Sequence, residues 1–102
     1  MSKLVSAKIQ RLAQIDRVIH EPARLMIVAI LSAVNEADFQ YLHQSTGLTK
    51  GNLSVHLSRL EEAGYVEIEK TFRGKYPLTI CRLTKQGKNV LDTYRKVIRN
   101  AL

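Results

Sequence analysis

The stretch LTKGNLSVHLSRLEEAGYVEIEKTFRGKYPLTICRLTKQGK, residues 48–88, decides the fold because its hydrophobic period changes within it. In its first part Leu53, Leu57 and Leu60 recur at steps of four and three residues, which is the spacing of one face of an α-helix. Thr49 is a typical N-cap for this helix, and Gly64 is typical of the position where a helix ends. We therefore predict a helix over residues 50–63.

After this helix the period becomes two. Residues 65–72, YVEIEKTF, alternate apolar with charged side chains and predict a half-buried strand. Residues 73–77, RGKYP, predict a turn, and residues 78–83 predict the returning strand of a hairpin, because a proline is tolerated at the first position of a strand.

Upstream of the stretch, Asp38 is expected to cap a short helix from Phe39 to about Ser45 that ends at Gly47. This helix and the next predict a helix-turn-helix over residues 38–63. Residues 35–37, NEA, break the preceding pattern. Before them PARLMIVAILSAV, residues 22–34, is apolar on almost every side, which predicts a central buried helix with Pro22 in its first turn.

Two amphipathic helices are expected at the ends of the chain. The first covers residues 4–19 with a stripe of Val5, Ile9, Leu12, Ile15 and Ile19. The last covers residues 84–101, is capped by Thr84, and carries its apolar stripe on Val90, Leu91, Tyr94, Val97, Ile98 and Ala101. The expected fold is mainly α with an antiparallel β wing of two to three strands, in one domain spanning residues 1–102 with the wing over residues 65–83.

Charge and composition narrow the classes of function. The 102 residues carry a formal net charge of +7, and residues 50–102 hold eleven basic and five acidic side chains, which favours a polyanionic partner. A single cysteine, Cys81, excludes an internal disulfide and is typical of a reducing compartment. The longest apolar run lies around residues 25–31, well short of the roughly 20 residues a membrane span needs. We expect a cytoplasmic protein with no membrane partner.

Within residues 48–88, LSVHLSRLEEAGYV matches the pattern S-x-H-L-x-x-L-x-x-A-G-x-V, and LTKQGK matches L-T-x-x-G-x. Together with HEPARLMIVAIL, residues 20–31, these motifs resemble the small archaeal and bacterial winged-helix transcriptional regulators of the MarR/ArsR superfamily. The resemblance covers about two thirds of the chain. It implies DNA binding through the helix over residues 50–63 and its wing, and it implies a dimer formed by terminal helices.

Two groups of residues are expected to contact DNA. The helix face opposite its leucines carries side chains suited to base edges and backbone, with Asn52 and Arg59 as the base readers. The wing tip carries three cations suited to phosphates or the minor groove, with Phe72 and Tyr76 bracing the tip. The full set is Thr49, Lys50, Asn52, Ser54, Val55, His56, Ser58, Arg59, Lys70, Arg73 and Lys75.

Neither a metal site nor a catalytic site is expected. His20, His43 and His56 lie far apart in the sequence, and the single cysteine forms no ligand pair. Ser54 and His56 are two positions apart on a helix and cannot face each other. The sequence therefore predicts no enzyme, no cofactor and no metal, and His56 is interpreted as a packing or phosphate-contacting residue.

The leading hypothesis is a homodimer that binds double-stranded DNA sequence-specifically. The dimer interface is expected on the stripes of the two terminal helices, at Val5, Ile9, Leu12, Val90, Leu91, Tyr94, Val97 and Ile98, because a compact winged-helix core does not need both helices. Two alternatives remain: a winged helix that binds an acidic protein, and a non-specific DNA-binding protein. A small-molecule effector, bound between the terminal helices and the DNA-binding lobe, is a further possible partner.

Overall fold

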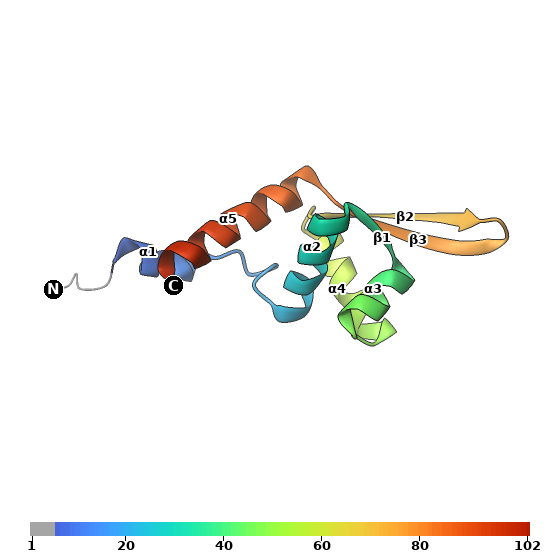
Figure 1. The fold of residues 1–102 in the computed structure, drawn as a ribbon, viewed down its shortest axis with the longest axis horizontal. Helices are drawn as coiled ribbons and strands as arrows, with labels where there is room; N and C mark the ends of the chain where they lie inside the picture. Colours follow the sequence, from blue (N-terminus) through green and yellow to red (C-terminus); the bar gives the residue numbers. More distant parts are fainter. Residues whose placement is uncertain (1–5) are drawn as a thin grey trace.

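The computed structural model describes residues 6–102 (Figure 1). Its elements in chain order are α1 (Ala7–Gln10), the 3₁₀ helix η1 (Arg11–Gln14), α2 (Pro22–Val34), β1 (Glu36–Asp38), α3 (Phe39–Thr46), α4 (Lys50–Glu62), β2 (Val66–Arg73), β3 (Tyr76–Leu83) and α5 (Lys85–Ala101). Helices α2, α3 and α4 pack beside a three-stranded antiparallel sheet of order β1-β3-β2, and α5 leads away from it (Figure 1). This is the winged-helix arrangement that the sequence predicted.

The core lies where α2 meets α4 and the sheet. The three leucines of α4, Leu53, Leu57 and Leu60, are at most 3% exposed, and Leu42 of α3 is fully buried. They pack in one cluster with Ile27, Val28 and Leu31 of α2, with Val66, Cys81 and Leu83 of the sheet, and with Leu91 of α5. The predictions of a central apolar helix and of the α4 leucine face are confirmed.

Side-chain caps begin three of the helices at the predicted residues. The Oδ1 atom of Asp38 accepts a hydrogen bond from the backbone N–H of Tyr41 at 2.7 Å, and Thr49 Oγ1 accepts one from Asn52 at 3.1 Å. Thr84 Oγ1 accepts from Gly87 at 3.0 Å. Each such cap is worth about 1 kcal/mol of helix stability. These local signals explain why the boundaries of α3, α4 and α5 were predictable.

The first predicted helix is confirmed only in part, and its C-terminal third is wrong. Within residues 6–19 the helical structure is limited to α1 and η1, and residues 15–19 form no helix. Asp16 Oδ1 accepts hydrogen bonds from the backbone N–H groups of Val18 at 2.9 Å and Ile19 at 3.2 Å, which closes a local turn in place of a helical turn. Ile19 is consequently fully buried in the core of the protomer itself.

Two details of the sheet differ from the expectation. Residues 36–38 form the edge strand β1, with Ala37 paired to Cys81, whereas the sequence analysis took Glu36 and Ala37 as part of a break and Asp38 only as a helix cap. Three residues are too few to show a period, so only pairing with β3 identifies them as a strand. The hairpin turn is also shorter, because Arg73 already pairs with Tyr76 and only Gly74 and Lys75 lie between the strands.

The protomer is elongated, with extents of 65 × 25 × 21 Å and a radius of gyration of 16.0 Å. A compact domain of this length has a radius of gyration of about 13 Å. The excess arises because the distal half of α5 projects from the core with α1 packed beside it, and because the β2–β3 hairpin projects in the opposite direction (Figure 1). None of the helices in residues 6–102 is long and apolar enough to cross a membrane.

The buried thiol of Cys81 makes stability sensitive to alkaline pH. Burial, with the Asp38 and Glu61 carboxylates, raises the pKa of Cys81 from 9.0 to about 11. The unfolded chain therefore releases this proton first, so this contribution to folding is complete below pH 9 and is lost as pH rises through 11. We expect the free energy of unfolding to fall between these pH values by about 1.4 kcal/mol per pH unit from this group.

Urea unfolding at several pH values checks this expectation, with Cys81→Ala as the comparison. The variant loses the thiol but keeps every other group that titrates in this range, including Tyr65. We expect a shallower decline of stability for Cys81→Ala between pH 9 and 11. Parallel declines for the two proteins would contradict the assignment.

Candidate nucleic-acid interface

Successive side chains of α4 are rotated by about 100° around the helix axis, so its residues fall on different sides of the helix. The leucine side is buried in the core, and three other sides remain. Opposite the leucines lies a crest, which we define as Gly51, Val55 and Glu62, all exposed. The flank that faces the N-terminus of α2 carries Asn52, His56 and Arg59. The flank that faces the hairpin carries Ser54, Ser58 and Glu61.

The N-terminal end of α4 is exposed and carries the polar residues predicted for a DNA contact. Lys50 and Asn52 are exposed, whereas the Thr49 hydroxyl is engaged in capping the helix. Val55, on the crest, is 55% exposed although it is apolar. An exposed apolar side chain between polar neighbours suits contact with a thymine methyl group. This end of the helix therefore has the chemistry for entering a major groove.

A groove of about 610 Å³ separates α4 from the hairpin. Ser54, Ser58 and Glu61 line one side, and Ile68, Lys70 and Thr79 line the other, with Phe39 among the remaining residues. Lys70 is thus the hairpin cation that lies across from the recognition surface of α4. The carboxylate of Glu61 in the same groove offsets part of that positive charge.

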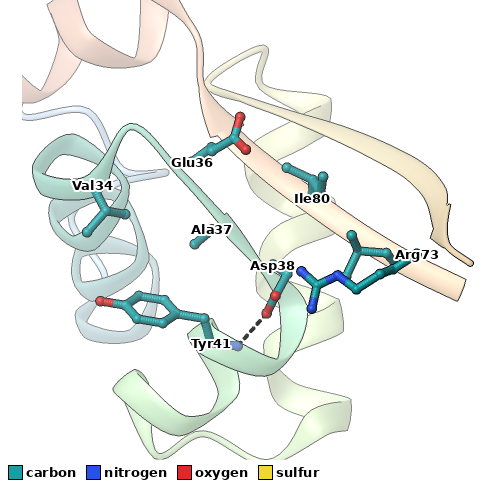
Figure 2. Close-up of a pocket in the computed structure, with 8 residues that line it drawn as sticks. Val34, Glu36, Ala37, Asp38, Tyr41, Arg73 and Ile80 are labelled. Atoms are coloured by element: carbon teal, nitrogen blue, oxygen red, sulfur yellow. Dashed lines mark hydrogen bonds between the residues drawn. The ribbon is translucent and has the colours of Figure 1, made fainter. Parts of the chain in front are cut away.

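The structure does not bring the three wing cations together. Because side chains alternate along a strand, Lys70 and Arg73 lie on opposite faces of the hairpin, and Lys75 lies in its turn. The Arg73 guanidinium points toward Asp38, in a depression lined also by Val34 and Ile80 (Figure 2). The sequence analysis missed this because it placed Arg73 in the turn, whereas β2 extends to Arg73 in the structure.

The predicted bracing of the wing tip is wrong. Phe72 is 69% exposed and Tyr76 is 77% exposed, so neither side chain is packed against the tip. Phe72 lies opposite Pro77 and Tyr76 opposite Arg73, where the hairpin has already passed the end of β1 and has no third strand to support it.

His56 lies toward α2 instead of the crest. Its Nδ1 atom is 3.2 Å from Nη1 of Arg24 and 3.9 Å from Oε1 of Glu21, and its side chain is 20% exposed. This placement supports the packing interpretation of His56. Within residues 6–102 there is no group of three His, Cys, Asp or Glu side chains that could hold a metal ion.

Two arginines that the sequence analysis did not single out lie beside α4. Arg17 and Arg24 join Arg59 around a shallow depression of about 370 Å³, which Val18, Glu62 and Ala63 complete. Arg17 fell within the wrongly predicted first helix, and Arg24 within an apolar helix. No local pattern connects them to Arg59, which follows 35 residues after Arg24 in the chain.

The predicted dimerisation residues fall into two groups. Leu91 is 2% exposed and belongs to the core of the protomer, so it is not available to a second copy, and Val90 and Tyr94 pack against the same core. Tyr94 also forms a hydrogen bond with His20 at 2.9 Å. Ile9 is 46% exposed, and Leu12, Val97 and Ile98 are half-buried. These four residues lie on the projecting arm, which we define as α1, η1 and the distal half of α5. Val5 lies outside the described residues.

A groove of about 350 Å³ lies where α5 passes the connection between η1 and α2. Its apolar lining comes from Ile15, Val90, Tyr94 and Val97, and its polar lining includes Gln14, Asp16, Gln86 and Asn89. Tyr65 donates a hydrogen bond to Asp16 at the edge of this region, and burial together with Asp16 raises the pKa of Tyr65 to about 12. The groove thus lies between α5 and the residues that connect η1 to α2.

Comparison with known proteins agrees with this geometry. Residues 23–102 match the family described as winged helix DNA-binding domain. The chain is 33% identical over 78 residues to the uncharacterised protein MJ0432 of Methanocaldococcus jannaschii, covering 76% of this chain and 85% of that protein. It is 30% identical over 81 residues to the uncharacterised HTH-type transcriptional regulator YcgE of Bacillus subtilis, covering 79% of this chain and 53% of YcgE. The chain thus spans about half the length of YcgE.

Solved structures show the same fold. A transcriptional regulator homologue from Pyrococcus horikoshii superposes with a TM-score of 0.83 at 26% identity, covering 88% of this chain and 91% of that one. A MarR family regulator from Silicibacter pomeroyi gives 0.67 at 21% identity, covering 92% and 60% of the two chains. NadR in complex with 4-hydroxyphenylacetate gives 0.65 at 21% identity, covering 98% and 71%.

YcgE and the Pyrococcus horikoshii protein are described as transcriptional regulators, the class of protein that the sequence predicted in place of an enzyme. The family match covers every element from α2 to α5, including the helix-turn-helix and the wing on which the interface is built. The chain belongs to the winged helix DNA-binding domain family.

Proposed function

We propose that the protein is a homodimeric transcriptional regulator that binds double-stranded DNA sequence-specifically in the cytoplasm. The observation that carries this proposal is the exposed, polar N-terminal half of α4, which lies between the Lys70 side of the hairpin and the arginines near α2. Lys50, Asn52 and Val55 supply base-reading chemistry, and cations on both flanks supply phosphate contacts. Lys75, in the hairpin turn, extends the phosphate contacts along the wing, whereas Arg73 faces Asp38 on the other side of the hairpin.

The shape of the protomer supports a dimer. The projecting arm of α1, η1 and distal α5 leaves Ile9 exposed and leaves Leu12, Val97 and Ile98 half-buried. A second copy related by a two-fold axis would cover this apolar surface with the same surface of its own. Such a dimer presents two α4 helices to half-sites about 10 base pairs apart or a multiple of that distance.

The groove between α5 and the η1–α2 connection is the place that an effector would occupy in this proposal. NadR, which shares the fold, was solved with 4-hydroxyphenylacetate bound. The apolar walls and amide side chains of the groove suit a small molecule with an apolar body and a polar group. An effector held there would contact both the arm and the lobe that carries α4.

Selection of bound fragments from a random DNA pool tests the DNA-binding proposal. We expect enrichment of a sequence with two-fold symmetry, and we expect affinity to fall steeply between 50 and 200 mM salt. Binding without enrichment would favour the non-specific alternative. Failure to bind any duplex would favour the winged helix as a protein-binding module.

The wing makes a separate prediction. Lys75→Ala is expected to weaken binding to the selected duplex and to a random duplex by the same factor, and to lower the slope of log affinity against log salt by about 0.9, because one phosphate contact is lost. Lys96→Ala is the matched control, since it removes the same charge from the exposed surface of α5. Salt-titrated binding measures both. An unchanged slope for Lys75→Ala would exclude a phosphate contact at this residue.

A further inference from the structure

The depression beside the C-terminal half of α4 concentrates positive charge. Arg17 comes from the loop before α2, Arg24 from the first turn of α2, and Arg59 from α4. One carboxylate, that of Glu62, lines the same depression. Three arginines from three different segments therefore line a shallow depression that has one carboxylate among its lining residues.

Arg24 is held in position by the fold. Its Nε atom donates a hydrogen bond to the backbone carbonyl of Val18 at 2.5 Å, and its Nη1 atom is 3.2 Å from Nδ1 of His56. Val18 is itself held in place, because its backbone N–H donates a hydrogen bond to Oδ1 of Asp16. A guanidinium has five N–H donors, so these two contacts leave donors for a further partner. A side chain fixed in this way loses little conformational entropy when it binds an anion.

The three arginines are not consumed by ion pairs within the protein. In residues 6–102 the ion pairs of arginine involve Arg82 with Glu36 and Glu69, and Arg95 with Asp92. Arg17, Arg24 and Arg59 form none with the described carboxylates. Guanidinium groups match the oxygen geometry of a phosphate in two parallel hydrogen bonds. The chemistry of the depression therefore fits a phosphate oxyanion.

We propose that Arg17, Arg24 and Arg59 together bind a phosphate of the DNA backbone, so that Arg59 anchors α4 instead of reading a base. This inference rests on the proposed DNA binding. Arg59 lies on the same flank of α4 as Asn52, seven residues and thus about 10 Å further along the axis. In helix-turn-helix proteins the N-terminal residues of the recognition helix contact bases. With Asn52 at the groove, the distal end of this flank meets the neighbouring strand of the backbone.

This site gives the loop of residues 15–21 a function in DNA binding. The loop has no helical structure because Asp16 closes it, and the resulting turn carries Arg17 beside α2 and α4. A continuous helix through residue 19 would place Arg17 elsewhere. The proposed DNA footprint therefore extends from the wing, across α4, to the loop before α2.

Arg17→Ala and Arg59→Ala test this site on the full chain, with the duplex obtained by selection and a random duplex of equal length as probes. For each variant we expect the same factor of affinity loss on both duplexes, and a salt slope lower by about 0.9. Asn52→Ala is expected to behave differently and to reduce the ratio between the selected and random duplexes. Arg99→Ala, an exposed arginine on α5, is the matched control and should leave both readouts unchanged.

The outcomes separate this inference from the proposed function. If the wild-type protein binds neither duplex, the DNA-binding proposal fails. If the wild type binds and Arg17→Ala leaves the slope unchanged, or Arg59→Ala changes the ratio between duplexes, only the phosphate site is overturned.

A titration with inorganic phosphate, followed by thermal unfolding, tests whether the site binds a free phosphate ion. Stabilisation by phosphate that Arg17→Ala abolishes, without any change in the DNA salt slope, would also overturn the DNA-backbone assignment. Circular dichroism of each variant verifies that it is folded.

Discussion

Gly87→Ala is expected to lower the free energy of unfolding by about 3 kcal/mol, because the new methyl group has no space. A Cβ atom at residue 87 would lie 2.3 Å from the carbonyl oxygen of Tyr65 and 2.8 Å from Cδ1 of Leu83. The Tyr65 oxygen cannot move freely, since it accepts a hydrogen bond from the backbone N–H of Thr84 at 3.0 Å. Thr84 Oγ1 also donates to the carbonyl of Gly64 at 2.7 Å. Relief of the clash would therefore separate α5 from the base of the wing.

Gly51→Ala is the matched control for this prediction. A Cβ atom at residue 51 has no neighbour within 4 Å, and residue 51 lies in the first turn of α4. Alanine is the better helix former, so we expect Gly51→Ala to stabilise the protein by about 0.5–1 kcal/mol. Urea unfolding followed by circular dichroism measures both variants in the absence of DNA. Shifts of the unfolding midpoint in the same direction would contradict the packing at Gly87.

Ile98→Asp is expected to convert the proposed homodimer into monomers. Ile98 is half-buried on the distal half of α5, beside α1 and η1, on the arm that leaves the core of the protomer. A carboxylate there would lose its hydration in the dimer without a compensating partner, which costs several kcal/mol for each copy. Because the two-fold axis repeats the change in both protomers, we expect the dissociation constant of the dimer to rise at least about 100-fold.

Sedimentation equilibrium measures this change directly, with Asn100→Asp as the control. Asn100 is exposed on the polar side of α5, and its replacement adds the same negative charge without entering the apolar stripe. Ile9→Asp, which changes the exposed apolar residue of α1, gives an independent variant if Ile98→Asp fails to fold. A wild-type protein that sediments as a monomer at all concentrations would overturn the proposal. So would a dimer that both variants leave intact.

Affinity for DNA provides a second readout of the same change. A dimer holds two α4 helices at a fixed separation, so binding at one half-site raises the effective concentration at the other. Ile98→Asp is therefore expected to lose much more affinity for the symmetric selected duplex than for a duplex with a single half-site. Equal losses on the two duplexes would indicate that the variant impairs each half-site contact instead of the link between them.

The sequence-based predictions were accurate where an element is determined by interactions between residues close together in the sequence. Asp38, Thr49 and Thr84 cap helices through hydrogen bonds to residues three positions away, and the α4 leucines mark their face by spacing. The predicted helix over residues 4–19 was wrong over residues 15–19 for a related reason. Its apolar spacing was helical, but the side chain of Asp16 competed successfully for the backbone N–H groups that a helix would have used.

The interface was only partly predictable. The sequence identified the exposed residues of α4, because they are the positions left over once the leucines face the core. It did not identify Arg17 and Arg24, which reach Arg59 only because the turn at Asp16 and the start of α2 meet α4. It also grouped Lys70 with Arg73, which the pleat of the hairpin places on opposite faces.

By itself, the sequence determined the winged-helix order of elements, the exposed face of α4 and the excess of positive charge after residue 49, since each is encoded in composition or in spacings of two to four residues. Only the tertiary structure decided which cations lie close together and which apolar residues of the terminal segments are buried in the core. Leu91 and Ile19 are buried in the protomer core, whereas Ile9 is exposed and Ile98 half-buried on the projecting arm. The physical reason is that packing between residues far apart in the sequence determines which neighbours a side chain contacts, and local periodicity carries no information about those contacts.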